Sequence, residues 1–164
     1  GSKWGIKIDY SLEKIALSTM GPIALIENLP ENFLIMNGDV LTDISYAELY
    51  DYHCSQNKIF TISSFIRIVK NDYGVLDVNK NRTLKNFSEK PKIKHEVSMG
   101  IYCANRQVLN YLPKNKYYGF DDLMMDLIKK NKQVNVKSHS GYWLDIGRPE
   151  DYSKACKDFE KIAS

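Results

Sequence analysis

The chain has 164 residues, of which 23 are Lys or Arg and 20 are Asp or Glu, so its net charge is only +3. This length suits one domain with a buried core, and so mild and scattered a charge indicates neither a nucleic-acid nor a membrane partner. The three cysteines form no CxxC pair and the three histidines are dispersed, which argues against a disulfide framework or a zinc site. No signal peptide or membrane-length apolar stretch is visible, so we expect a cytoplasmic protein.

The first third of the chain predicts a strand, a helix, a strand and a second helix. Apolar residues at period two predict a strand over 3–10. Pro22 suits the first turn of a helix that Pro30 ends, with Ile23, Leu25 and Ile26 packed inward. The apolar run 33–36 is typical of a strand buried on both faces. A capping-box spacing then predicts a helix from about residue 45, and the expected inward face of that helix comprises Tyr46, Leu49, Tyr50 and His53.

The rest of the chain also alternates between predicted strands and predicted helices. Apolar runs predict strands at 59–66, 97–105, 133–137 and 141–147, and the polar turn 79–82 predicts a hairpin between 74–79 and 83–90. Helices are expected at 106–113, at 120–131 and from Pro149 onward, the last with Tyr152, Cys156 and Phe159 inward. We therefore expect one α/β domain over 1–164, with a mixed, mostly parallel sheet between helical layers.

The stretch FLIMNGDVLTD (33–43) allows two interpretations. Asn37-Gly38 between apolar runs is a strong hairpin signal, which would pair 34–36 with 40–42 and leave Asp39 in a solvated turn. The helix expected from residue 45 leaves little room for a return strand. A strand followed by a helix fits better, with Asp39 at the carboxyl end of the strand, where ligands bind in α/β sheets.

Two stretches, FLIMNGD and GYWLDIG, share the design of an apolar strand that ends in an aspartate near a glycine. Asp39 and Asp145 would suit a hard cation such as Mg²⁺, although each aspartate would equally serve a turn or a helix cap. Glu89-Lys90 at another strand end would bind a phosphate and hydroxyl groups, or would simply be a solvated pair before Pro91.

Six stretches in sequence carry a resemblance that covers essentially the whole chain: LSTMGPI, ENFLIMNGDVLTD, DYGVL, FSEKP, VSMGIY and GYWLDIGRPEDY. In order and spacing they resemble the sugar nucleotidyltransferases, the pyrophosphorylases that make nucleotide-diphospho-sugars. The resemblance is to mannose-1-phosphate guanylyltransferase-like and glucose-1-phosphate thymidylyltransferase-like members. It implies the Rossmann-like nucleotide-diphospho-sugar transferase fold.

The resemblance implies transfer of a nucleotidyl group from a nucleoside triphosphate to a sugar 1-phosphate, giving a nucleotide-sugar and pyrophosphate. The implied sugar is mannose-like and the implied base is guanine. By this resemblance Asp39, Lys90 and Asp145 are catalytic, with Asp39 and Asp145 holding Mg²⁺ and Lys90 beside the sugar phosphate. The implied substrate-binding residues also include Thr19 and Gly21 near the base, Glu89 at the sugar hydroxyls, Gly74 and Gly100, which would let backbone amides approach the sugar, and Gly38.

One family feature does not occur in this sequence, namely the glycine-rich GGxGxRLxPLT loop that wraps the triphosphate. The chain therefore resembles the later part of a longer enzyme, N-terminally truncated and inactive by itself, and a missing first strand would leave an edge open to homo-oligomer formation. Two alternatives stay open. A nucleotide-sugar-dependent glycosyltransferase normally carries an Asp-x-Asp pair, which the spacing of Asp39 and Asp43 does not match. A non-catalytic, regulatory relative would bind the ligands without turnover.

Overall fold

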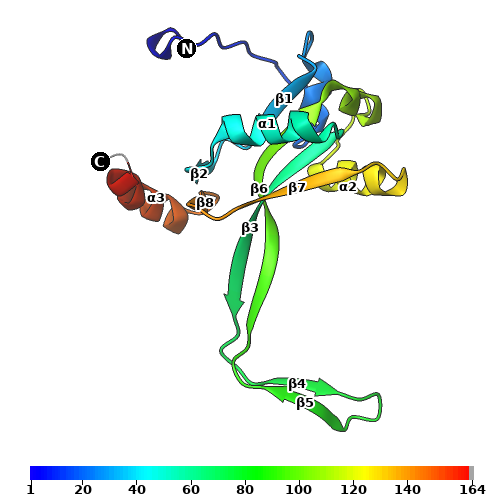
Figure 1. Ribbon diagram of the computed structural model, residues 1–164, viewed down its shortest axis with the longest axis vertical. Helices are drawn as coiled ribbons and strands as arrows, with labels where there is room; N and C mark the ends of the chain where they lie inside the picture. Colours follow the sequence, from blue (N-terminus) through cyan, green and yellow to red (C-terminus); the bar gives the residue numbers. More distant parts are fainter. Residues whose placement is uncertain (163–164) are drawn as a thin grey trace. The chain divides into compact units, whose positions relative to one another are not determined.

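The computed structural model describes residues 1–162 and shows helices interleaved with strands (Figure 1). The α-helices are α1 (Tyr46–Gln56), α2 (Phe120–Lys129) and α3 (Pro149–Ile162), and short 3₁₀ helices form at η1 (Ser2–Trp4), η2 (Gly21–Leu25) and η3 (Arg106–Tyr111). The strands are β1 (Asn32–Met36), β2 (Val40–Thr42), β3 (Phe60–Lys70), β4 (Val75–Val78), β5 (Leu84–Ser88), β6 (Lys92–Asn105), β7 (Val134–His139) and β8 (Trp143–Asp145). The predicted α/β fold with a mixed sheet is confirmed. None of the described helices is long and apolar enough to cross a membrane.

The strands form three sheets. The largest has the order β1-β6-β3-β7, and β2-β8 and β4-β5 are separate two-stranded sheets. Strands β3 and β6 run antiparallel, because Asn105 N donates to Ile59 O at one end while Asn71 N donates to Pro91 O at the other. The chain divides into two compact units, the first comprising 1–36, 46–62 and 102–135 and the second comprising 37–45, 63–101 and 136–164.

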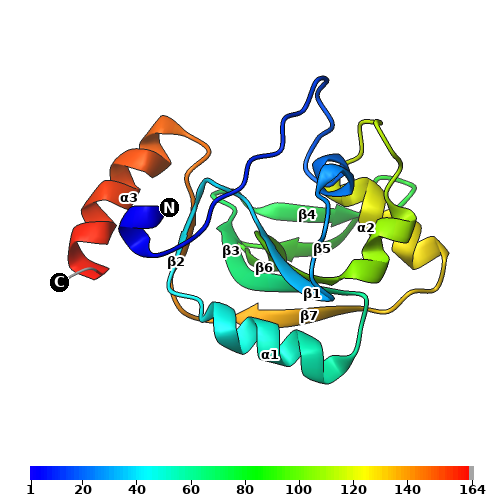
Figure 2. The same ribbon diagram turned by 90° about the horizontal axis from the view of Figure 1, so that it is seen from above.

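The first unit contains the hydrophobic core, built around α2 (Figure 2). Leu123 and Leu127 on this helix are completely buried, and burial of each leucine contributes about 1.5–3 kcal/mol. The ring of Phe120 stacks on Tyr102 at a centroid distance of 4.6 Å. The Asp122 carboxylate accepts a hydrogen bond from Gly119 N, which satisfies one free donor at the start of the helix. The helix predicted over 120–131 is confirmed, although its apolar residue Ile128 remains 63% exposed.

Several sequence-based expectations about burial are wrong. The strand expected over 3–10 does not form, because no neighbouring strand pairs with these residues in the described chain, and Tyr10 is 92% exposed. The strand over 33–36 is not buried on both faces, since Phe33 is buried but Met36 is half exposed. Expected inward residues also face solvent in η2, α1 and α3, and these are Ile26, Tyr46, Tyr50, Tyr152, Cys156 and Phe159.

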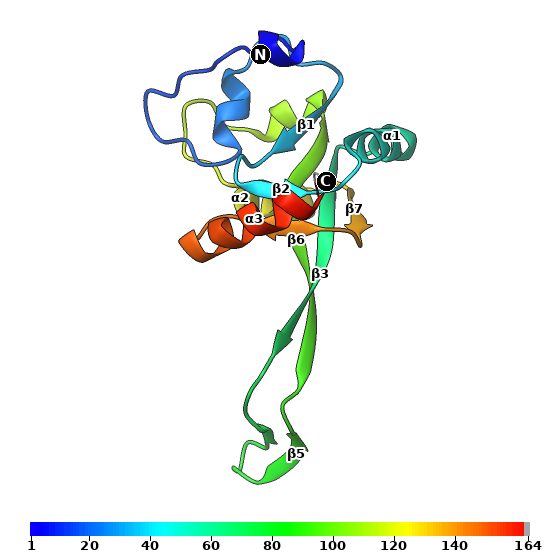
Figure 3. The same cartoon turned by 90° about the vertical axis from the view of Figure 1, so that its left-hand side faces the viewer.

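The second unit contains the two small sheets. The outer parts of β3 and β6 run side by side as a ribbon that leads to the β4–β5 hairpin (Figure 3). The hairpin is antiparallel, as predicted, with Val75 opposite Ser88 and Asn79 N bonded to Thr83 O across the turn. The strands β2 and β8 also pair antiparallel, and α3 follows β8 after a three-residue turn. Among the predicted site residues, Asp145 lies in one of these sheets, and five more lie in the turns beside their strands, namely Gly38, Asp39, Gly74, Glu89 and Lys90.

Candidate active site

The segment that directly follows FLIMNGD pairs with the strand of GYWLDIG in the structure. Strand β2 pairs with β8 so that Val40 lies opposite Asp145, and the next backbone hydrogen bond runs from Ile146 N to Asp39 O at 2.8 Å. This pairing brings Asp39 and Asp145, 106 positions apart in the sequence, to the same end of one small sheet. Both side chains are exposed. Asp39 lies in the turn outside the ladder, so the alternation of a strand does not fix the direction of its side chain.

The hairpin interpretation of Asn37-Gly38 is wrong for two reasons. Strand β1 pairs in the large sheet while β2 pairs with β8, so the two strands that flank this turn belong to different sheets. Neither Asn37 nor Gly38 adopts a positive φ, which the favoured two-residue hairpin turn requires at both positions. A short strand does follow the turn, but its partner is β8, and α1 begins four residues after its last residue.

Two glycines lie at or beside this turn, Gly38 and Gly100, and they differ in whether the structure requires a glycine at that position. Gly100 has a φ of +76°, and a Cβ there would lie 2.7 Å from Asn37 Nδ2, while its carbonyl accepts a hydrogen bond from Asn37 N. Gly38 has no positive φ, and a Cβ added there would meet nothing within 4 Å. The fold therefore requires glycine at 100, whereas at 38 the absent side chain leaves open space beside Asp39.

The predicted sugar-site residues gather on the β4–β5 hairpin. A Cβ on Gly74 would lie 2.6 Å from the Phe87 ring and 3.2 Å from Glu89 Oε2, so Gly74 and Glu89 are neighbours. Lys90 is exposed and has a φ of +43°, which is uncommon for a residue with a side chain. The hairpin lies at the far end of the β3–β6 ribbon from β2 and β8 (Figures 1 and 3), so the structure does not bring Glu89 and Lys90 to the aspartates.

Thr19 and Gly21 lie in the first unit, where each has a role in the fold itself. The Thr19 hydroxyl accepts a hydrogen bond from Phe120 N at the start of α2. A Cβ on Gly21 would lie 2.9 Å from Leu17 Cβ, and the Gly21 amide donates to Tyr118 O. These contacts explain both residue types without a ligand, and their role near a base stays a prediction.

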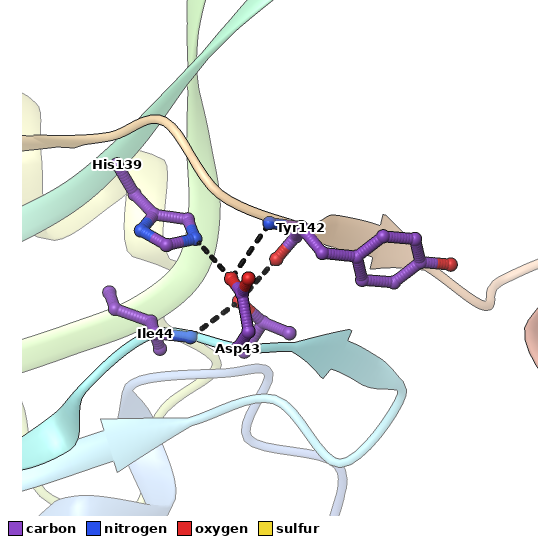
Figure 4. Close-up of polar contacts among 5 residues, drawn as sticks. Asp43, Ile44, His139 and Tyr142 are labelled. Carbon is purple, nitrogen blue, oxygen red and sulfur yellow. Dashed lines mark hydrogen bonds and ion pairs between the residues drawn. The ribbon is translucent and has the colours of Figure 1, made fainter. Parts of the chain in front are cut away.

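Asp43 is the centre of a polar cluster that sequence reasoning missed (Figure 4). Its Oδ1 accepts hydrogen bonds from His139 Nε2 at 2.8 Å and from Tyr142 N at 2.7 Å. The Thr42 hydroxyl donates to Tyr142 O and accepts from Ile44 N. These bonds join the end of β2 to the turn before β8, and thereby hold the register that brings Asp39 to Asp145. The partners are almost 100 residues apart, so no local pattern could reveal them.

The Asp43 cluster predicts a pH-dependent stability. Burial raises the pKa of the Asp43 carboxyl, but the hydrogen bonds from Tyr142 N–H and His139 outweigh burial and hold this pKa below its ordinary value of 3.8. A lowered carboxyl pKa in the folded state stabilises the fold above the unfolded pKa, and this stabilisation is lost as the pH falls below 3.8 through the folded value. Since the carboxylate is half exposed, we expect Asp43→Asn to cost only about 1 kcal/mol at pH 7.

Urea denaturation of the wild type and of Asp43→Asn at pH 7 and at pH 3 would measure this effect. The difference in unfolding free energy should shrink at pH 3, because pH 3 lies below the ordinary carboxyl pKa of 3.8, where the unfolded state binds the proton that the folded carboxylate resists. Asp51→Asn, an exposed aspartate of α1, is the control and should change stability little at either pH. An Asp43→Asn effect of the same size at both values would show that the charge of Asp43 does not matter.

Comparison with known proteins identifies the family. Residues 1–162 match the family described as "Nucleotidyl transferase". The chain belongs to the Nucleotidyl transferase family. It is 30% identical over 156 residues to the mannose-1-phosphate guanylyltransferase catalytic subunit beta of Drosophila melanogaster, covering 92% of this chain and 42% of that relative. It is 27% identical over 158 residues to the mannose-1-phosphate guanyltransferase of Saccharomyces cerevisiae, with 92% of this chain and 44% of that relative covered. The chain thus spans less than half the length of these relatives.

A solved member of similar fold is HddC from Yersinia pseudotuberculosis. It is 26% identical to this chain, with a TM-score of 0.64 over 94% of this chain and 68% of HddC. A second HddC structure, complexed with GMP-PN, has a TM-score of 0.63, is 25% identical, and covers 93% of this chain and 67% of that one. The fold and the family agree with the resemblance read from the sequence motifs.

The aspartate pair of this nucleotidyl transferase chain fits a Mg²⁺ ion that shares its ligands with a substrate. Among residues 1–162 no group of three or more His, Cys, Asp or Glu side chains could hold a metal by itself. Mg²⁺ at phosphate-transfer sites typically takes only one or two protein carboxylates and completes its shell with phosphates and water. Asp39 and Asp145, exposed at one end of the β2–β8 sheet, meet that requirement.

Proposed function

We propose that this chain is part of a sugar-1-phosphate nucleotidyltransferase, and that GTP and mannose 1-phosphate are the first substrates to test. The observation that supports the proposal is the β2–β8 pairing, which sets Val40 opposite Asp145 and bonds Ile146 N to Asp39 O, in a chain of the Nucleotidyl transferase family. The names of the Drosophila and yeast relatives support mannose and guanine, and the GMP-PN complex of HddC supports a guanine nucleotide.

In the proposed reaction, a phosphate oxygen of the sugar 1-phosphate attacks the α-phosphorus of the triphosphate in line. A new P–O bond forms, the bond to the β-phosphate breaks, and pyrophosphate leaves with that electron pair. Such a reaction depends on positioning and on neutralised charge. Asp39 and Asp145 would hold Mg²⁺, and the ion would neutralise charge on the phosphates. Gly38 admits the substrate beside Asp39, because in the described chain no atom beyond Gly38 and its two chain neighbours lies within 4 Å of the position its Cβ would take.

Glu89 and Lys90 are proposed to bind the sugar hydroxyls and the sugar phosphate. This assignment rests on the resemblance of FSEKP to the family motif, and because the hairpin lies at the far end of the β3–β6 ribbon it requires the hairpin to approach the β2–β8 sheet when substrate binds. The contact of Gly74 with the Glu89 carboxylate supports a shared role for the hairpin residues. The positive φ of Lys90 supports it further, because strained backbone conformations cluster at ligand-binding positions.

The test is pyrophosphate release by the longest natural protein that contains this sequence, with a panel of nucleoside triphosphates and sugar 1-phosphates. We expect release that requires Mg²⁺ and both substrates. A nucleotide-sugar-dependent glycosyltransferase would instead release a nucleoside diphosphate from a nucleotide-sugar. A regulatory relative would bind these ligands without releasing either product.

Lys90→Ala in the same protein should raise the KM for the sugar 1-phosphate roughly tenfold or more, since a hydrogen bond to a charged group contributes about 1.5–3 kcal/mol. The kcat should change less, provided the contact is equally strong in the ground and transition states. Steady-state kinetics at saturating triphosphate measures both constants. Lys80→Ala, in the turn of the same hairpin, is the matched control and should leave the KM unchanged. If the KM of Lys90→Ala equals the wild-type value, Lys90 does not bind the sugar phosphate.

A further inference from the structure

Strand β6 has an irregular backbone at Gly100, within the second unit. The φ of Gly100 is +76°, although this residue lies in the interior of the strand. A glycine inside a strand often marks a bulge or a close backbone approach, and bulges are common next to active sites. The neighbouring Met99 and Ile101 are each only 1% exposed. We call residues 99–101 the Gly100 segment.

Both segments that carry a candidate aspartate bind to the Gly100 segment. Asn37 N donates a hydrogen bond to Gly100 O at 2.9 Å. The indole N–H of Trp143 donates to Met99 O at 3.0 Å. In each case the candidate aspartate follows the donor residue by two positions in the sequence. Because two residues of chain span at most about 7 Å, a shift of the Gly100 segment would move both aspartates.

A serine of β3 holds the third carbonyl of the Gly100 segment. Ser63 Oγ donates to Ile101 O at 2.5 Å, and Ser63 is completely buried. The three successive carbonyls thus accept hydrogen bonds from three separate parts of the chain, namely β8, the turn after β1, and β3. A buried hydroxyl destabilises the fold unless it is hydrogen-bonded, so the bond to Ile101 O explains why a polar side chain is tolerated at this position.

The relative position of the two aspartates matters for a shared ion. Mg²⁺ requires near-octahedral geometry, with ligand oxygens about 2.0–2.1 Å away, so two carboxylates that share it must be held in a fixed relation. The β2–β8 pairing supplies one connection between them. Asp39 lies in the turn outside that ladder, however, and the Gly100 segment supplies a second connection, because it binds both this turn and β8.

We propose that Ser63 is a positioning residue of the transferase. Its hydroxyl fixes the Gly100 segment, and this segment in turn sets the distance between Asp39 and Asp145 that a shared Mg²⁺ needs. Ser63 occurs in none of the six stretches that carry the resemblance. Trp143 occurs in one of them, in which the resemblance assigns a role to Asp145 alone. The inference rests on the proposed function, since it concerns the metal site of that reaction.

Ser63→Ala in the longest natural protein that contains this sequence tests the proposal by steady-state kinetics. The kcat should fall, and the Mg²⁺ concentration for half-maximal rate should rise, each roughly tenfold, which is the low end of the cost of losing a group that orients metal ligands. In the Asp145→Asn background Ser63→Ala should lower the rate little further, because the ligand that it positions has already lost its charge.

Ser64→Ala is the matched control. Ser64 is the next residue of β3, is only 2% exposed and also donates a hydrogen bond, but its acceptor is Glu96 Oε1, outside the Gly100 segment. The loss of this buried hydroxyl should lower the melting temperature about as much as Ser63→Ala does. The Mg²⁺ requirement should nevertheless stay at the wild-type value.

Hydrogen exchange followed by mass spectrometry tests the same contact without substrate. In Ser63→Ala the peptide that contains Asn37 should exchange faster, since its N–H donates to the carbonyl of Gly100. In Ser64→Ala this peptide should exchange at the wild-type rate. Ser63→Cys replaces the hydroxyl with a weaker donor and should give a smaller change, and it replaces Ser63→Ala in both assays if that variant does not fold.

A folded Ser63→Ala protein with the wild-type Mg²⁺ requirement and wild-type exchange at Asn37 would overturn the proposal while the proposed function stands. Equal effects of Ser63→Ala and Ser64→Ala in both assays would also overturn it, because a general loss of stability would explain them. If no substrate pair gives transfer in the wild type, the proposed function fails. Faster exchange at Asn37 in Ser63→Ala alone would still show that Ser63 holds the Gly100 segment.

Discussion

Asp39→Asn and Asp145→Asn in the longer protein should each lower the rate of nucleotidyl transfer roughly 10²–10³-fold, the usual cost of removing one preorganised electrostatic contact. Both substitutions keep the shape of the side chain and remove the charge that would face Mg²⁺. Both carboxylates are exposed and lie in or beside a turn, where asparagine serves about as well as aspartate. We therefore expect little change in melting temperature, so the loss is one of function and not of folding.

Steady-state kinetics as a function of Mg²⁺ concentration measures this loss. If the aspartates hold the ion, the variants should also need more Mg²⁺ for half-maximal rate. Asp51→Asn removes one exposed carboxylate of α1 and should keep the wild-type rate. If a well-folded Asp39→Asn protein has wild-type kinetics, Asp39 is not needed for catalysis and the Asn37-Gly38-Asp39 stretch is an ordinary turn.

Gly100→Ala should lower the melting temperature by several degrees and lower activity as well. The φ of +76° costs a residue with a side chain about 1–2 kcal/mol, and the added Cβ would lie 2.7 Å from Asn37 Nδ2. For a chain of this size each kcal/mol corresponds to roughly 2–4 °C. The clash would displace Asn37, and with it the turn that carries Asp39, so substrate turnover should fall together with stability.

Gly5→Ala is the matched control for this experiment. Gly5 also has a positive φ, of +67°, but a Cβ there would meet nothing within 4 Å. It should therefore show the cost of the backbone conformation alone, without loss of activity. Thermal denaturation of the two variants then separates the cost of a positive φ from the cost of the clash between the added Cβ and Asn37. Equal shifts in melting temperature, with wild-type turnover for both, would show that contact between Gly100 and Asn37 does not position the active site.

Some of the protein follows from local sequence. The hairpin over 74–90 and the helix over 120–131 form where predicted, because turn residues and a 3.6-residue apolar period act between near neighbours. The order of six motifs was enough to indicate the family, since the residues of a motif are those whose type the reaction of the family requires. The same motifs identified Asp39 and Asp145 as a pair.

Other features depend on packing between distant segments. The apolar period of residues 3–10 predicted a strand that does not form, since a strand needs a partner for its backbone hydrogen bonds and period two does not supply one. In the same way, Asn37-Gly38 carries a hairpin signal, yet the flanking strands pair elsewhere. In both cases local propensity did not decide the structure, because the partner with which a strand pairs depends on the fold of the whole chain.

By itself, then, the sequence determined the family, most of the regular elements and the residue types at the candidate site. Only the tertiary structure decided that β2 pairs with β8, that Asp43 bonds to His139 and Tyr142, and that Ser63 and Trp143 bond to the Gly100 segment. These contacts join segments about 40 to 105 positions apart. The physical reason is that local hydrogen bonds and periodicity act over a few residues, whereas strand register and convergent hydrogen bonds depend on the packing of the whole unit.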